Sequence, residues 1–268
     1  MKKNNSKELS IQVNLNGLSF CILNKTIHRI EFLYSINFEQ KLTPFDTLNK
    51  LKEELSSNTI FADDFDSVIV IHQNELATLV PKALYSDKFK ADYLKFNSKI
   101  LKTDFITQDH IAINNSVNVY IPYVNINNYI FETFGEFVFK HSSTILIERA
   151  LDSITTAEKP KVHLHVNTTS IEVLVIDKGQ LQLFNFFEYH TKEDFIYYVL
   201  FVFEQLKLDP ESTHITLTGS IDKDDELYTS LYTYVRHVTI LDPILNFEFS
   251  DTIKKENLHH HYLILNSF

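Results

Sequence analysis

A repeated stretch constrains the fold of this chain more than any other feature of its sequence. Residues 9–25 read LSIQVNLNGLSFCILNK, and residues 162–178 read VHLHVNTTSIEVLVIDK, which aligns with the first stretch without a gap. The apolar positions coincide along most of the match. Three pairs are identical: Val13 with Val166, Asn14 with Asn167, and Lys25 with Lys178. Self-similarity at such a long period indicates a chain built from two like halves.

Each copy of the repeat predicts a three-stranded antiparallel meander. Apolar and polar residues alternate, a polar tetrad marks a turn, and an apolar run follows that ends at a second turn. A third run of strand-forming residues comes next in both copies, at residues 27–34 (IHRIEFLY) and 180–187 (QLQLFNFF).

The segments after each meander also correspond. Thr43-Pro44 and Thr191 are typical helix starts, because threonine caps free backbone N–H groups and proline suits the first helical position. The second helix begins with an apolar run at residues 195–203, which predicts burial on most of its sides. Matching short strands are predicted after the two helices, at residues 67–72 and 214–219.

The second half then predicts a helix at about 224–235 and a strand at 238–241, which completes a β-β-β-α-β-α-β order. The first half carries an insertion at about 73–116. Its remaining elements are a helix near 87–97 and a strand at 117–122, then a helix at 125–134 ended by Gly135, a strand at 137–140, and a helix at 142–151 capped by Ser142.

These patterns predict an α/β protein of two lobes with mixed sheets. The first lobe spans residues 1–152 and the second spans residues 153–268. The polar stretch 152–161 (DSITTAEKPK) is the predicted linker. A C-terminal tail begins at Asn246, and its last residues, YLILNSF, are compatible with a strand that returns to either lobe.

Composition limits the classes of function. The formal net charge is −10, which disfavours nucleic acid as a partner, because phosphate contacts need clustered Lys and Arg. Only four glycines are present, which argues against a phosphate-binding P-loop. Cys21 is the only cysteine, so no intrachain disulfide forms, and its apolar neighbours indicate a structural thiol. The longest apolar run falls short of the roughly 20 residues of a membrane span, so we expect a soluble cytoplasmic protein.

Two tandem units of this order, each opening with a hairpin, resemble the duplicated core of the actin-like ATPase superfamily. The whole chain, including FDSVIVIHQNELATLVPKALY and VNVYIPYVNINNYIFETFGEFVFKH, resembles an uncharacterised bacterial family typical of flavobacteria, which has an actin-like ATPase fold and no established activity. The resemblance implies duplicated actin-like, ribonuclease H-like lobes that face a central cleft, and it makes ATP or ADP the candidate ligand.

In active members of the superfamily, an Asp in the first hairpin turn of each lobe organises Mg²⁺, and Gly and hydroxyl residues wrap the phosphates. Both matching positions here hold Asn, which preserves such a turn but offers no negative charge to a hard cation. The adenosine-binding glycine pair of the superfamily corresponds to Gly219-Ser220 here, so one of its two glycines is present. The resemblance thus implies these candidate nucleotide-binding residues: Asn14, Asn16, Gly17, Asn167, Thr168, Thr169, Gly219 and Ser220.

No residue matches the catalytic Gln or Glu of the superfamily, and Gln73, Glu75 and Glu148 are candidates by proximity in sequence alone. Asn14 and Asn167 are equally explained as plain turn residues, since Asn bonds its own backbone. The run 259–261 (HHH) offers at most His259 and His261 to a shared metal if it lies in a strand, so we expect no metal site there.

The leading hypothesis is a cytosolic pseudo-ATPase that serves as a scaffold or binding component for an unknown protein partner. The alternative is an active ATPase or small-molecule kinase with an altered metal site. A third alternative is a membrane-associated assembly factor, like the actin-like proteins of pilus and secretion systems. We expect a monomer or dimer rather than a filament, because no repeat of surface apolar residues suggests a lateral contact in the insertion.

Overall fold

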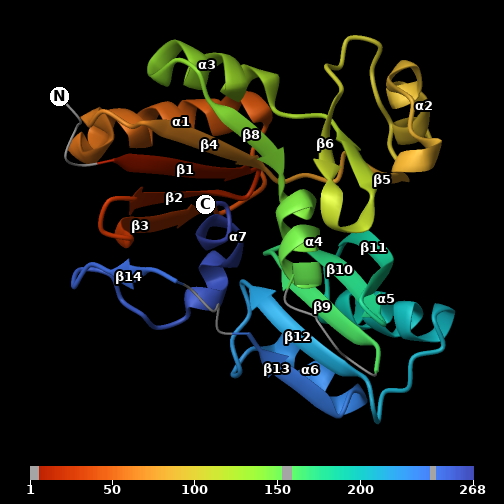
Figure 1. Ribbon diagram of the computed structural model, residues 1–268. Coiled ribbons are helices and arrows are strands. Elements are labelled where there is room, and N and C mark those ends of the chain that lie inside the picture. Colours follow the sequence, from red (N-terminus) through yellow and green to blue (C-terminus); the bar gives the residue numbers. More distant parts are fainter. Residues whose placement is uncertain (1–5, 153–158, 242–245) are drawn as a thin grey trace.

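The protein consists of two twisted sheets set side by side, with helices on their outer faces and a smaller sheet beside them (Figure 1). The computed structural model describes residues 6–152, 159–241 and 246–268. Much of the predicted linker, residues 153–158, therefore lies outside the described residues. The fold class expected from the repeat is confirmed.

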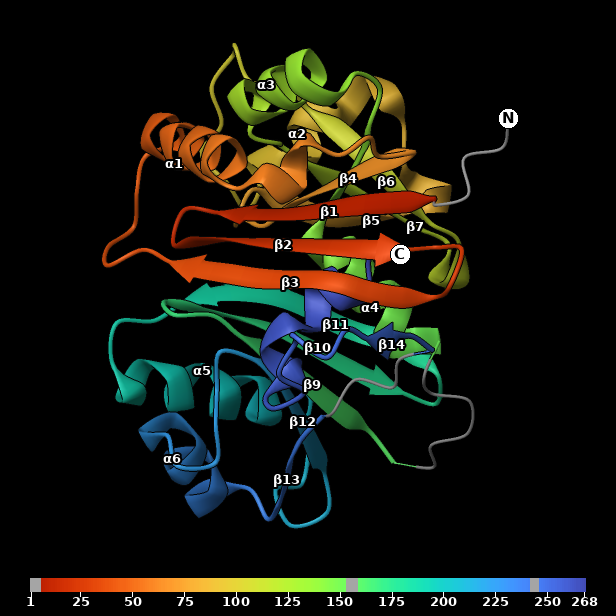
Figure 2. The same ribbon diagram turned by 90° about the vertical axis from the view of Figure 1, so that its left-hand side faces the viewer.

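The sheet of the first lobe has six strands in the order β14-β3-β2-β1-β4-β8. Its strands are β1 (Lys7–Asn14), β2 (Gly17–Asn24), β3 (Arg29–Asn37), β4 (Ser67–His72), β8 (Val138–His141) and β14 (Glu248–Phe249). Helices α1 (Pro44–Ser57) and α3 (Val124–Phe134) cover its outer face (Figure 2). Strand β1 pairs antiparallel with β2 and parallel with β4, so the chain crosses back after β3 and adds β4 beside the first strand of the meander.

The second lobe repeats this plan. Its sheet has the order β11-β10-β9-β12-β13. The strands are β9 (Lys161–Val166), β10 (Ser170–Asp177), β11 (Gln180–Glu188), β12 (His214–Gly219) and β13 (His237–Ile240). The helices are α5 (Lys192–Gln205) and α6 (Glu226–Tyr234). Strand β9 pairs antiparallel with β10 and parallel with β12, as β1 does with its own neighbours.

The insertion of the first lobe and the strand that follows it form the third sheet, with the strand order β5-β7-β6. Its elements are β5 (Ala77–Pro81), α2 (Lys90–Lys95), β6 (Thr107–Ile111) and β7 (Ser116–Tyr120). Short 3₁₀ turns, residues 59–62, 82–84, 87–89 and 112–114, complete the connections.

The predicted helix starts are confirmed. The Thr43 hydroxyl accepts a hydrogen bond from the Asp46 backbone N–H (3.2 Å). Thr191 forms a capping box with Asp194, in which each side chain accepts from the backbone N–H of the other residue. These bonds satisfy donors that the first helical turn leaves free, and so fix where both helices begin.

Helix α5 is less buried than its sequence predicted. One face packs on the second sheet through Phe195, Val199 and Val202, while Tyr197 is 63 % exposed and Phe201 is 40 % exposed. The exposed rings of Tyr197 and Phe201 stack on each other and do not pack against a further element of the described chain. An all-round apolar helix needs a partner on every side, and the described residues supply the second sheet and helix α6 only.

The sequence predicted Ser142 as the cap of helix α4 (Ser142–Asp152), but Ser142 does not cap it. Its hydroxyl donates to Glu172 (3.0 Å), which is a carboxylate of the other lobe. His141 takes the capping role, because its Nδ1 accepts from the backbone N–H of Ser143 (3.2 Å). The predicted cap was wrong because Ser142 is already the first residue of the helix, which places His141 at the capping position.

The C-terminal residues form a helix and not a strand. A 3₁₀ turn, η5 (Leu258–His261), leads into α7 (Tyr262–Leu265), which packs against β1, β2, α4 and β12. Four successive residues are buried in α7, so the segment is apolar on all sides. A short apolar run of this kind fits a buried strand or a buried helix equally, which is why periodicity misled the prediction.

The two lobes share an apolar core around α4 and α7. It combines Leu23 of β2 and Leu174 of β10 with Ile147 of α4 and Ile264 of α7. Strand β14 of the tail pairs with β3 of the first sheet, so the tail of the chain returns to the first lobe.

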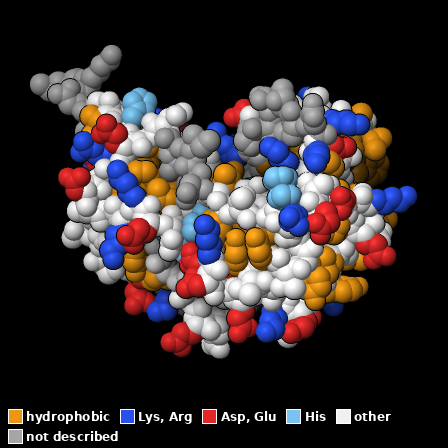
Figure 3. Space-filling view, turned by 90° about the horizontal axis from the view of Figure 1, so that it is seen from below, with side chains coloured by type: hydrophobic (Ala, Val, Ile, Leu, Met, Phe, Trp, Pro, Cys, Tyr) orange, Lys and Arg blue, Asp and Glu red, His pale blue; other side chains and the backbone are white. Residues whose placement is uncertain are grey.

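Among the described residues, none of the helices combines the length and the apolar character that crossing a bilayer requires. Acidic and basic side chains are interspersed on the face shown in Figure 3.

Candidate functional site

The hairpin turns of the two lobes face each other across the interface. Asn16, after β1, donates from its Nδ2 to the Thr169 hydroxyl, after β9, at 3.0 Å. Asn14 folds its own turn, because its Oδ1 accepts from the Asn16 backbone N–H at 2.7 Å. The two matched asparagine positions of the repeat are thereby placed at the same end of the interface.

Gln73 bridges the two turns. It follows β4 and is 3 % exposed. Its Oε1 accepts from Gln12 Nε2 and from Asn14 Nδ2, each at 3.0 Å. Its Nε2 donates to Asn167 Oδ1 at 3.0 Å and to Glu172 Oε2 at 2.9 Å. A side-chain amide has two acceptor positions and two donors, and all four are used here.

Glu172 is a carboxylate at the centre of the protein. It lies within β10 and is fully buried. Its oxygens accept from the Gln73 amide and from the Ser142 hydroxyl, and no salt bridge to it occurs within the part of the chain that the structure describes. Burial raises the pKa of Glu172 to about 7. The hydrogen bonds from neutral donors lower this pKa, but they offset only part of the effect of burial.

The predicted nucleotide-binding residues are brought together, but around little space. A cavity of about 100 Å³ is lined by Asn14, Asn16, Gly17, Asn167, Thr168, Gly219 and Ser220. Thr169 lines a neighbouring cavity of about 30 Å³, together with Gln73 and Glu75. Pockets for small molecules usually enclose about 300–1,000 Å³. Both cavities are smaller than this range.

The presence of glycine at positions 17 and 219 is explained by the close approach of neighbouring backbone. Gly219 has a φ of +86°, and a Cβ there would lie 2.1 Å from the Val166 carbonyl oxygen. A Cβ at Gly17 would lie 2.5 Å from the Ile36 carbonyl oxygen. Both glycines allow neighbouring backbones to approach, so their presence alone does not indicate a ligand.

Of the catalytic candidates, only Gln73 and Glu75 lie at the lobe interface. Glu148 forms an ion pair with Lys140 at 3.2 Å and is partly exposed. Sequence reasoning missed Glu172 and Ser142, which complete the polar network. Glu172 had a signal, because it is a lone carboxylate inside the apolar run IEVLVI, and such a group in a buried strand needs partners.

A larger groove lies between the insertion and the second lobe. It encloses about 760 Å³ and is bordered by β5, by the loop after α2, and by Phe184–Phe186 of β11. Glu172 and His141 reach its lining from the lobe interface. Burial lowers the pKa of His141 to about 3, so its ring is neutral. This groove is in the size range of a binding site.

The chain belongs to the family described as "Protein of unknown function (DUF3822)", whose model matches residues 1–238. A protein of Bacteroides thetaiotaomicron with an actin-like ATPase fold and unknown function is similar to it, with a TM-score of 0.82 and 22 % identity over 98 % of this chain and 96 % of that chain. The PilM-PilN type IV pilus biogenesis complex contains a chain with a TM-score of 0.61 and 10 % identity, over 96 % and 94 %. No curated protein matches the chain. These likenesses show an actin-like ATPase fold.

Proposed function

We propose that this member of the DUF3822 family is a pseudo-ATPase, a binding or scaffold protein that keeps the actin-like fold without turning over Mg-nucleotide. The observation that carries the proposal is the position of Gln73. Its amide holds Asn14 of one lobe and Asn167 of the other at 3.0 Å each, in the space between the two hairpin turns.

The chemistry of the network supports this proposal. Mg²⁺ is held mainly by carboxylates, phosphates and water. The two turns offer amides instead, and Glu172 accepts hydrogen bonds from uncharged partners. Amides bonded to amides need no cation, so the closed interface is stable without a ligand.

The test is calorimetric titration with ATP and ADP, with and without Mg²⁺, alongside a turnover assay. We expect no measurable heat and no hydrolysis. Thr168 is exposed and lines the 100 Å³ cavity, so Thr168→Glu blocks the site without disturbing the core. Turnover by the wild type that disappears in Thr168→Glu would establish the alternative, an active enzyme of the superfamily. Turnover that persists in the variant comes from a contaminant.

The groove of about 760 Å³ is the surface we assign to a protein partner. Strand β5 is an edge of the insertion sheet and β11 is an edge of the second-lobe sheet, and both border the groove. An edge strand has unpaired backbone N–H and C=O groups, to which an extended peptide can add as a further strand. Phe96, at the rim, is 87 % exposed and would supply apolar contact. The partner segment we expect is an extended peptide with apolar side chains.

Selection of displayed peptides on the purified protein tests this surface. Peptides enriched on the wild type should alternate apolar residues and should lose binding to Phe96→Ala. The matched control is Phe131→Ala on α3, which removes a ring that is 59 % exposed and lies outside the groove lining. Equal loss in both variants, or in neither, would count against the groove.

A further inference from the structure

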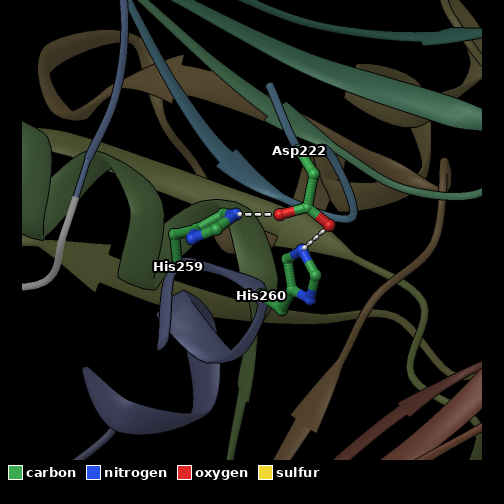
Figure 4. Close-up of side chains that lie close together, drawn as sticks. All are labelled: Asp222, His259 and His260. Atoms are coloured by element: carbon green, nitrogen blue, oxygen red, sulfur yellow. Dashed lines mark ion pairs between the residues drawn. The ribbon is translucent and has the colours of Figure 1, made fainter. Parts of the chain in front are cut away.

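Asp222 stands between two histidines of the C-terminal segment (Figure 4). It follows β12 in the second lobe, whereas His259 and His260 belong to η5. His259 Nε2 lies 3.4 Å from Asp222 Oδ1, and His260 Nε2 lies 3.2 Å from Asp222 Oδ2. One ligand-type atom from each residue lies within 4.8 Å of the others.

We propose that Asp222, His259 and His260 bind a divalent transition metal of the zinc type. In a tetrahedral zinc site with bonds of about 2.0–2.1 Å, neighbouring ligand atoms are about 3.3–3.4 Å apart. Each histidine nitrogen lies at about this distance from a different oxygen of the Asp222 carboxylate. One ligand atom from each residue already lies within 4.8 Å of the others, so rotation of these side chains brings one carboxylate oxygen and both nitrogens around an ion. Two imidazoles and a carboxylate are a donor set that zinc accepts, and three protein ligands leave one position for water.

In the strand expected from the sequence, His259 and His261 would share one face and could bind the same ion. The structure has a 3₁₀ turn there instead, and a different pair of histidines comes together. In η5, His259 and His260 are the two rings that approach the same carboxylate. Their ring centroids lie 4.4 Å apart, with the ring planes at 71°, so both rings face the carboxylate without stacking.

The site is closed on one side and open on the other. His259 is buried, while the side chains of Asp222 and His260 are 34 % and 32 % exposed. His260 also lines the cavity of about 100 Å³.

One interaction competes with the metal. His259 Nε2 also lies 2.9 Å from the Ile221 carbonyl oxygen, to which its N–H donates in the metal-free protein. Binding requires the other tautomer, with the proton on Nδ1, and replaces this hydrogen bond with a metal bond. Without an ion, the three side chains form an ordinary ion-pair cluster, which is the alternative that the experiment must exclude.

A bound ion would join two parts of the protein. Helix α7 follows η5 directly and packs against β1 and β2 of the first lobe, while Asp222 belongs to the second lobe. The ion would therefore fasten the C-terminal segment to the loop after Gly219-Ser220. Because an ion that binds only the folded state stabilises it, occupancy should raise the melting temperature.

The test uses the full chain, stripped with a chelator and titrated with Zn²⁺ against a chromophoric competitor. We expect one site per chain, a higher melting temperature with Zn²⁺, and, with Co²⁺ instead, the visible absorption of a tetrahedral complex. Asp222→Asn and His260→Ala should each weaken binding by about 100-fold or more, because each removes a direct ligand. Asn keeps the size of Asp, so this variant separates lost binding from lost folding.

His237→Ala is the matched control. His214 and His237 stack with ring centroids 4.4 Å apart at the far end of β12 and β13, and are the competing histidine pair. This control should keep the wild-type affinity, the thermal shift and the cobalt spectrum. The proposal is overturned if the stripped wild type binds no stoichiometric Zn²⁺, or if Asp222→Asn and His260→Ala keep the wild-type affinity. Loss of binding in His237→Ala alone would place the ion at the His214–His237 pair instead.

Discussion

Glu172 makes the stability of the protein depend on pH. Its carboxyl group is fully buried, and burial raises its pKa to about 7, from an ordinary value of 4.5. A group whose folded-state pKa is raised in this way favours the folded state when protonated. The folded protein therefore loses stability as the pH rises from the unfolded pKa through the folded one, and the loss is complete above pH 7.

The magnitude follows from the difference between the two pKa values. One pKa unit corresponds to about 1.36 kcal/mol, so a rise from 4.5 to about 7 gives a penalty of about 3 kcal/mol at pH 8. At pH 5 most of the penalty is absent, and it amounts to about 1 kcal/mol. The substitution Glu172→Gln removes the ionisation. A glutamine can still accept from Gln73 and donate to the Ser142 hydroxyl, so the network stays satisfied.

Urea unfolding of the wild type and of Glu172→Gln, at intervals from pH 5 to pH 8, measures this effect. We expect the stability advantage of the variant to grow by about 2–3 kcal/mol across this range. Glu148→Gln is the matched control, because this carboxylate is partly exposed and pairs with Lys140, and its variant should show no such growth. An advantage of Glu172→Gln that is constant or falls with pH would refute the reasoning.

Three further predictions concern the backbone, the shared core and the thiol. Gly219→Ala should cost more than about 2 kcal/mol in urea unfolding, since its Cβ meets a backbone carbonyl, while Gly179→Ala, also at positive φ but in open space, should cost about 1 kcal/mol. Ile264→Ala should destabilise by about 2–5 kcal/mol because α7 fills the core between the lobes, whereas Ile27→Ala, at an exposed site, should change stability by less than about 0.5 kcal/mol. Burial raises the pKa of the Cys21 thiol, so a thiol reagent should modify it only in denaturant, and modification of the native protein would contradict its buried position.

The repeat was sufficient to predict the arrangement of strands, because alternation and turn residues are local signals. Strands β4 and β12 begin and end where the apolar runs do, and Thr43 and Thr191 begin their helices. The tail was harder, because four consecutive buried residues carry no period that separates a helix from a strand. Its position depends on which space the two lobes leave open, and that is a property of the assembled fold.

The proximity of the two hairpin turns was predicted, and the contacts between them were not. The resemblance indicated both hairpin turns, and the structure places Asn14 and Asn167 at the same end of the lobe interface. The sequence around Asn14 and Asn167 does not predict that Gln73 lies between them, because these contacts join three segments that are far apart in the chain. The partner of the Ser142 hydroxyl was not predicted for the same reason, because it comes from the other lobe.

The Gln73 network also determines how tightly a nucleotide could bind. A nucleotide can enter only if the lobes separate. Separation breaks the bonds of Gln73 to Asn167 and to Glu172, the bond of Asn16 to Thr169 and the bond of Ser142 to Glu172. At about 1 kcal/mol net for each bond, the loss of these four bonds costs about 4 kcal/mol, which weakens the apparent affinity by about 1,000-fold. Gln73→Ala removes two of these bonds from the closed state, so it should bind ATP more tightly than the wild type if an intrinsic site exists. Calorimetric titration of both proteins measures the difference. Tighter binding by the wild type would instead show that Gln73 contacts the nucleotide, and that the amide network is part of a working site.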